Sequence, residues 1–102
     1  MHLPLITAAA LVLASAQAAP LADGAPDCAT VTASARLQAV GYQHVVTLAN
    51  HCQRPVSCEV WTNVDPSPHL TLRAKPGETA ETATRVGSPS RDVQAGKSCH
   101  FE

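Results

Sequence analysis

The segment TVTASARLQA, Thr30–Ala39, carries the clearest periodic signal in the chain. Its apolar residues are Val31, Ala33, Ala35, Leu37 and Ala39, and a polar residue precedes each of them. Because successive side chains of a β-strand point to opposite faces, this alternation predicts a strand with one buried face and one solvated face. The first predicted element of the folded domain is therefore a β-strand.

Further short segments of the same kind follow this first one. Strands are predicted over His44–Asn50, Val56–Val64, His69–Ala74 and Thr79–Val86, with two short pieces, Arg91–Ala95 and Lys97–Phe101, divided by Gly96. The turn signals VGY, DPSP, KPGE and GSPS separate them, and KPGE has proline and then glycine at the central positions of a type II turn. No helical period extends over several turns. Six or seven short antiparallel strands are typical of a β-sandwich or a small barrel, an all-β fold.

The first residues have the features of an export signal. Leu3–Ala14 is apolar, too short to cross a bilayer as a helix, and AQA at Ala16–Ala18 fits the small-x-small cleavage rule. The start has no Lys or Arg, so a retained anchor or a buried helix stays as the alternative. We predict a cleaved signal peptide over 1–18, a flexible lead-in over 19–27 and one β-sandwich domain over 28–102. The protein is then exported to the periplasm or the exterior.

All four cysteines fall in the predicted domain, where they would form two disulfides in an oxidising compartment. Cys52 and Cys58 flank QRPVS, and a hairpin turn there would place them opposite each other. Counting strand directions from that turn brings Cys28 and Cys99 to the same end of the domain. The preferred pairing is Cys52–Cys58 with Cys28–Cys99, while Cys28–Cys52 with Cys58–Cys99 stays open as the alternative.

Charge and hydropathy bound the choice of partners. The net charge is −1, and the seven Lys and Arg residues are scattered along the chain. A nucleic-acid surface or an anionic-membrane surface needs a basic patch, so neither is expected. No apolar stretch after the signal peptide is long enough to span a membrane. The expected partner is another protein or an envelope component, with no nucleic acid and no integral membrane segment after processing.

Metal and catalytic chemistry find little support in the spacing of the residues. The pairs His51-Cys52 and Cys99-His100, with His44 and His69, offer ligand types that suit zinc or copper. However, adjacent residues of a strand point to opposite faces, and the chain has no C-x-x-C motif. Metal binding through histidines is therefore only the alternative function, and no cofactor is expected. The serines of GSPS lack the strand–turn–helix context of a nucleophile, so no enzyme is predicted.

Trp61 suggests where a partner would bind. The even positions of Val56–Val64 are the apolar ones, which places Trp61 outward beside Glu59. With Arg54 and His51 on the neighbouring turn, it would form an aromatic anchor with a basic rim, the usual composition of a binding hot spot. The alternative is that Trp61 covers the sheet edge or a neighbouring loop.

The segments GYQHVVTLANHC, CEVWTNVDPSPHLTL, PGE and GSPSRDV, followed by Cys99, resemble those of a group of small exported bacterial proteins of unknown function. The resemblance covers about Cys28–Cys99. It implies an immunoglobulin-like, disulfide-bonded antiparallel β-sandwich, and it implies no activity or ligand. The sequence thus predicts an exported, non-catalytic binding or envelope-associated structural module.

Overall fold

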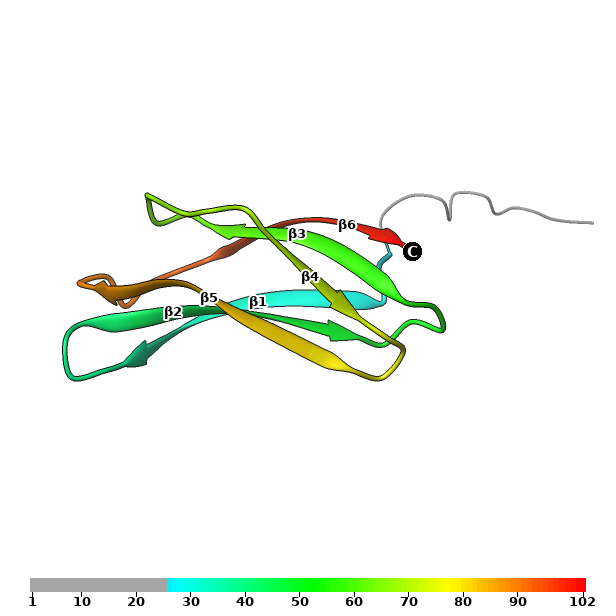
Figure 1. The fold of residues 1–102 in the computed structure, drawn as a ribbon, viewed down its shortest axis with the longest axis horizontal. Coiled ribbons are helices and arrows are strands. Elements are labelled where there is room, and N and C mark those ends of the chain that lie inside the picture. The colour runs from blue at the N-terminus through cyan, green and yellow to red at the C-terminus, as the bar shows by residue number, and fades with distance from the viewer. Residues whose placement is uncertain (1–25) are drawn as a thin grey trace, which may run out of the picture.

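The computed structural model describes residues 26–102, which form two antiparallel sheets packed face to face (Figure 1). Six strands make up these sheets: β1 Ala29–Leu37, β2 Tyr42–Asn50, β3 Val56–Thr62, β4 Leu70–Ala74, β5 Thr79–Ser88 and β6 Ala95–Phe101. The predicted signal peptide and most of the predicted lead-in lie outside the described residues. In the described part, no helix is long and apolar enough to cross a membrane.

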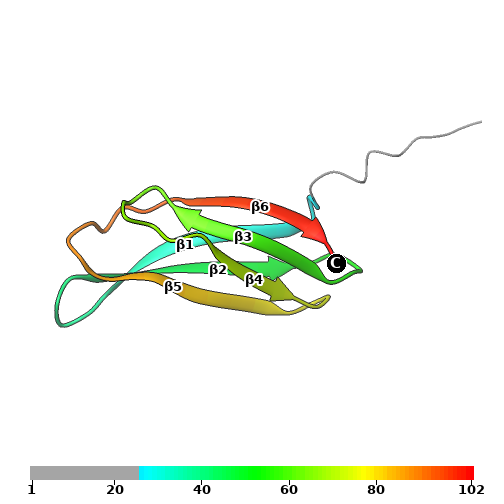
Figure 2. The same ribbon diagram turned by 45° about the horizontal axis from the view of Figure 1, so that its top comes forward.

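The order of the strands shows where the chain changes sheet. One sheet has the order β1-β2-β5 and the other has the order β4-β3-β6, with every pair antiparallel. The connections after β2, β4 and β5 therefore pass from one sheet to the other. Figure 2 shows β6 beside β1 on one flank of the molecule and β4 beside β5 on the other. Each flank thus brings together the edge strands of two different sheets.

The predicted strands agree with the observed ones in number and closely in position. The alternating segment Thr30–Ala39 forms β1, although its last two residues belong to the following turn. Gly96 does not divide two strands, because Ala95–Phe101 form one strand, β6, while residues 91–94 of the predicted piece Arg91–Ala95 are outside any strand. The smaller of the two expected strand numbers is therefore right. Gly77 of KPGE has a φ of 82°, and the amide of Glu78 donates to the carbonyl of Lys75 at 2.9 Å, as a type II turn requires.

The core lies between the two sheets and is built from small and branched side chains. Its largest fully buried apolar members are Val46 and Leu48 of β2 and Val56 and Val60 of β3. Full burial of one such side chain stabilises the fold by about 1.5–3 kcal/mol. No buried aromatic residue adds to this core among the described residues. Small domains with so small a hydrophobic core commonly depend on disulfides for stability.

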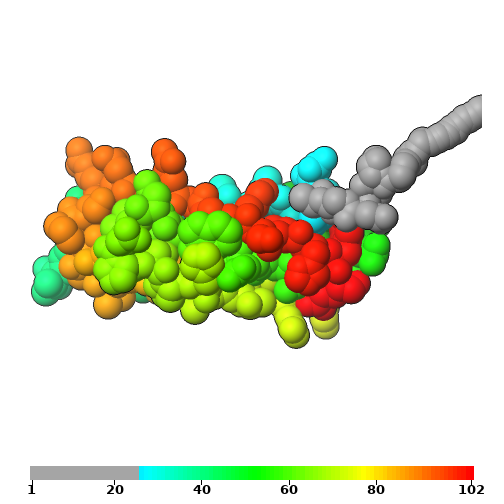
Figure 3. All heavy atoms as spheres, turned by 90° about the horizontal axis from the view of Figure 1, so that it is seen from above, coloured from blue at the N-terminus to red at the C-terminus, as the bar shows by residue number. Residues whose placement is uncertain are grey.

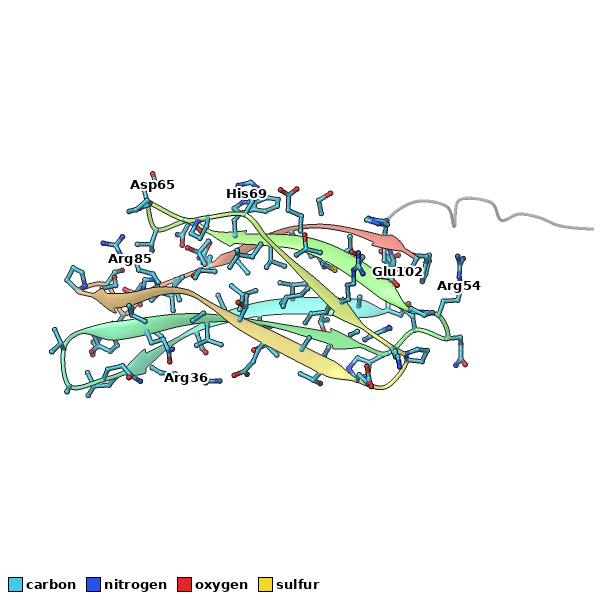
Figure 4. The ribbon with its side chains drawn as sticks, in the orientation of Figure 1. Arg36, Arg54, Asp65, His69, Arg85 and Glu102 are labelled. Atoms are coloured by element: carbon cyan, nitrogen blue, oxygen red, sulfur yellow. A yellow bond between two sulfur atoms is a disulfide. The ribbon has the colours of Figure 1, made fainter. Side chains whose placement is uncertain are left out.

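A bulge in the β1-β2-β5 sheet turns one side chain toward the opposite sheet. The pairing of β2 with β5 shifts between His44 and Val45, so that Thr84 has no partner of its own. A bulge re-aims the side chains beside it. Arg85, the next residue, donates from Nη1 to the backbone carbonyl of Asp65 in the β3–β4 connection. Figure 4 shows Arg85 and Asp65 at the same end of the molecule. This contact joins the two sheets at the end that carries the β3–β4 connection.

Candidate functional site

The disulfides differ from the preferred pairing and follow the alternative. Cys28 is bonded to Cys52, with their Cα atoms 5.0 Å apart, and Cys58 is bonded to Cys99, with their Cα atoms 4.0 Å apart. The preferred pairing assumed that β2 and β3 form a hairpin. That was wrong, because β2 and β3 belong to different sheets, so Cys52 and Cys58 do not lie opposite each other. Cys58 instead lies directly opposite Cys99 in the register of β3 with β6.

Each disulfide joins neighbouring strands of a single sheet. The Cys28–Cys52 bond closes the ends of β1 and β2, next to the paired residues Ala29 and Asn50. Sequence separations of 24 and 41 correspond to losses of unfolded-chain entropy worth about 3.5 and about 4 kcal/mol. Disulfides persist in oxidising compartments and are rare in reducing ones. This supports an oxidising environment outside the cytoplasm for the folded protein.

The connection between β2 and β3 is organised by Asn50, which the sequence analysis did not single out. Its side chain is buried, and its amide donates to the carbonyls of Arg54 and Ala74, each at 2.9 Å. Its Oδ1 accepts from the amide of Cys52 at 2.7 Å, which is an Asx-turn. An asparagine at the end of a strand is a local signal for such a turn. The contact with Ala74 depends on the fold of distant residues and has no local signal.

Arg54 and His51 lie on this connection, as the sequence predicts, but Arg54 is held against the end of β6. Its guanidinium lies over the ring of Phe101, 4.6 Å from the ring centroid, and donates to the carbonyl of Glu102 at 3.3 Å. His51 is exposed, and its backbone amide donates to the carbonyl of Cys28. On the β2–β3 connection, the Arg54 side chain is therefore held in place by contacts with β6 and the residue after it, while the His51 imidazole is exposed.

Trp61 lies on the outer face of the β4-β3-β6 sheet, where the alternation of β3 predicts it. Its indole stacks on the ring of His69, with centroids 4.4 Å apart and planes 5° apart. Nδ1 of His69 lies 3.0 Å from Oε2 of Glu59. The indole also lies over Gly96, its partner on β6, where any Cβ would overlap the ring. Trp61 therefore covers the edge strand and a neighbouring loop, the alternative weighed for it above.

Trp61 lies at a distance along β3 from the turn that carries Arg54 and His51, and a contact surface that includes all three stays a prediction. β3 begins at Val56, next to the turn that carries Arg54, and Trp61 is five residues further on. At the rise of an extended strand this separation is about 16 Å. Figure 4 shows His69, which stacks on Trp61, well away from Arg54. A partner that contacts all three residues would have to extend along β3.

His44 and the serines of GSPS are neighbours, but the contacts between them run through the backbone of Ser90. His44 is buried in β2, with Nε2 2.7 Å from the carbonyl oxygen of Ser90. Ser88 is buried, and its Oγ accepts from the amide of Ser90 at 3.1 Å, which is turn chemistry. All four cysteines are in disulfides, so none is a free thiolate ligand. Within residues 26–102, no group of three His, Cys, Asp or Glu side chains is placed to hold a metal ion.

A shallow, open depression of about 200 Å³ lies where the β4–β5 turn meets the end of the chain. Its lining residues are Pro55, Arg73, Ala74, Lys75, Glu78 and Glu102. Two cations and two carboxylates therefore surround it, and Nε of Arg73 lies 3.2 Å from Oε2 of Glu102. The charges of the depression are balanced in number, so it favours neither an anion nor a cation.

No family model, no curated protein and no solved structure matches this chain. The case for a function therefore rests on the fold and on its surfaces.

Proposed function

We propose that this protein is an exported, non-catalytic binding or envelope-associated module built on an immunoglobulin-like sandwich. The observation that carries the proposal is the pair of disulfides, each of which fixes two strands of one sheet. Disulfides stabilise a small domain whose hydrophobic core is too small to do so alone, and they keep its surface rigid. A rigid surface loses little entropy on association, which favours binding.

The order of the strands supports the immunoglobulin-like part of the proposal. In the immunoglobulin arrangement, strands A, B and E share one sheet, while C′, C and F share the other. The orders β1-β2-β5 and β4-β3-β6 correspond to these six strands in sequence. One departure is the disulfides: immunoglobulin domains link B to F across the sheets, whereas here both bonds lie within a sheet. The resemblance to small exported bacterial proteins points the same way and stays a prediction.

The outer faces of the sheets also suit a binding module. On the β1-β2-β5 sheet, both terminal nitrogens of Arg36 donate to the carboxylate of Glu81, at 3.3 and 3.2 Å. The register places Val45 of β2 between these two residues, which accounts for its burial on an outer face. On the outer face of the other sheet, Nδ1 of His69 lies 3.0 Å from Oε2 of Glu59. The two contacts place polar and charged groups from different segments side by side on each outer face.

The experiment is chemical cross-linking in intact bacterial cells that export the tagged full chain, followed by mapping of the linked peptides. We expect links from one defined region of residues 26–102 to one envelope component, reproduced between preparations. As a control, the same chain without residues 2–18 would be retained in the cytoplasm and should form no such links. The proposal is contradicted if the exported chain gives only intramolecular links, or if its thiols are found free in the mature protein.

A further inference from the structure

Within residues 26–102, one edge of the β4-β3-β6 sheet has no neighbouring strand. In this part of the chain β6 pairs only with β3. The Cα atoms of Cys58 and Cys99 are 4.0 Å apart, which is the short spacing of a non-hydrogen-bonded pair in an antiparallel ladder. The N–H and C=O groups of Cys99 therefore point away from β3, toward the free edge. Because this direction alternates along a strand, the backbone groups of Ala95, Lys97 and Phe101 point the same way.

A row of small, half-exposed apolar side chains lies beside this free edge. Ala95 and Cys99 of β6, and Val31 and Ala33 of β1, pack against the core while remaining partly accessible. Figure 3 shows that atoms of β1, in cyan, lie along the side of β6, in red. We call this surface, formed by Val31, Ala33, Ala95, Lys97 and Cys99, the β1–β6 flank. Its open backbone groups and its apolar row suit an extended chain with small apolar side chains.

A single positive charge lies in the middle of the flank. Lys97 faces inward between Ala95 and Cys99, and its Nζ donates to the backbone carbonyl of Ala29 at 3.4 Å. None of the ion pairs within residues 26–102 includes Lys97. An extended chain docked on β6 would place one of its own inward side chains next to this ammonium group. Charge complementarity then favours a carboxylate at that position.

We propose that the free edge of β6 accepts an extended, strand-forming segment of a partner protein, with an acidic residue next to Lys97 and small apolar residues two positions on either side. This inference rests on the proposed function and names its surface. In the seven-stranded immunoglobulin arrangement, a further strand pairs with the edge that corresponds to β6. The partner segment would occupy that place by strand addition. The Cys58–Cys99 bond holds β6 in position before the partner arrives.

The test uses a fluorescently labelled synthetic peptide whose inward positions are valine, glutamate and valine in that order. Threonines occupy the positions between and around them. Binding to the mature protein is followed by anisotropy, and hydrogen exchange of the backbone amides is followed by NMR. We expect slower exchange at Ala95, Lys97, Cys99 and Phe101. The same peptide with a central lysine should bind roughly twofold to thirtyfold more weakly, because an attraction worth about 1.4-fold to fivefold for an exposed charge pair is replaced by a repulsion of similar size. A peptide with methylated backbone nitrogens should not bind.

Matched variants locate the site on the protein. Lys97→Glu should reverse the preference, so that the lysine peptide binds more tightly than the glutamate peptide. Arg73→Glu, an equal charge change on the edge strand β4 of the same sheet, should leave the preference unchanged. Circular dichroism and thermal melts would confirm that both variants fold.

Three results would overturn the proposal: unchanged exchange at β6, the same preference in Lys97→Glu, or pairing of β6 between two copies of this chain with no peptide bound. The second would show that Lys97 only protects an edge strand from unwanted pairing, and the third would show that the edge of β6 serves self-association instead. The cross-linking experiment separates these failures from failure of the proposed function. If the envelope component is still linked to Lys97→Glu with the same efficiency, the binding function stands and the assignment to β6 falls.

Discussion

Replacement of Asn50 by alanine should be among the most destabilising single changes outside the core and the disulfides. The Asn50 side chain makes three hydrogen bonds from a buried position, and alanine would leave their partners without it. Two of those bonds, to the amide of Cys52 and the carbonyl of Ala74, are buried. A buried polar group left unpaired costs about 1–3 kcal/mol. Allowing for relaxation and entry of water, the free energy of unfolding should fall by roughly 2–4 kcal/mol.

The assay is a thermal melt of the mature, oxidised protein followed by circular dichroism. In a domain of this size each kcal/mol corresponds to about 4–8 °C, so the Tm should drop by roughly 8–32 °C. Asn63→Ala is the matched control, because Asn63 is exposed and its Oδ1 accepts a single bond, from the amide of Gln94 at 2.8 Å. That variant should lose at most about 1 kcal/mol.

Asn50→Asp sharpens the test, because it keeps the acceptor for Cys52 and removes only the two donors. A carboxylate would then face two carbonyl oxygens in a buried place, so this variant should be at least as unstable as Asn50→Ala at neutral pH. A Tm within about 2 °C of the wild type for Asn50→Ala would refute the reasoning. It would mean that water molecules form hydrogen bonds with the backbone groups of the turn as well as the Asn50 side chain does.

Three further predictions follow from the sequence and the fold. Intact mass of the exported protein should show a mature chain that starts at Ala19, within about two residues, and a soluble exported product that retains Met1 would contradict this. Peptide mapping without reduction should link Cys28 to Cys52 and Cys58 to Cys99, and a peptide joining Cys52 to Cys58 would show the pairing to be wrong. Trp61→Ala should lower the free energy of unfolding by about 1–3 kcal/mol, and Gly96→Ala should also destabilise, because both disturb the cover of β6; an unchanged Tm for both would contradict that role.

The strands and one turn could be predicted from the sequence because their causes are local. The alternation of Thr30–Ala39 is a property of neighbouring side chains, and it forms β1. The proline and glycine of KPGE set the backbone angles of their own turn, and Gly77 has the expected positive φ. Such features need no knowledge of the rest of the chain.

The disulfides and the contacts of Asn50 and Trp61 could not be predicted in the same way because they depend on which strands share a sheet. The segment between Cys52 and Cys58 looks like a hairpin turn, but the chain passes there from one sheet to the other. The role of Asn50 depends on Ala74, and that of Trp61 on Gly96, each a contact between segments far apart in the sequence. The local sequence pattern placed Asn50 and Trp61 correctly along their strands. It gave no information about the distant residues that they contact.

The two disulfides have a consequence for the β1–β6 flank. Because each bond lies within one sheet, the two sheets are held together by the packing of side chains such as Leu48, Val56 and Val60, without a covalent link between them. The covalent constraint acts instead on the edge strands, since one bond fixes the start of β1 and the other fixes the middle of β6. Within residues 26–102, β6 has no strand on its outer side, so its outward backbone groups are held in a fixed arrangement. A partner strand would then bind an edge that is already ordered by folding. Little conformational entropy of β6 would be lost on binding, and this favours high affinity in strand addition.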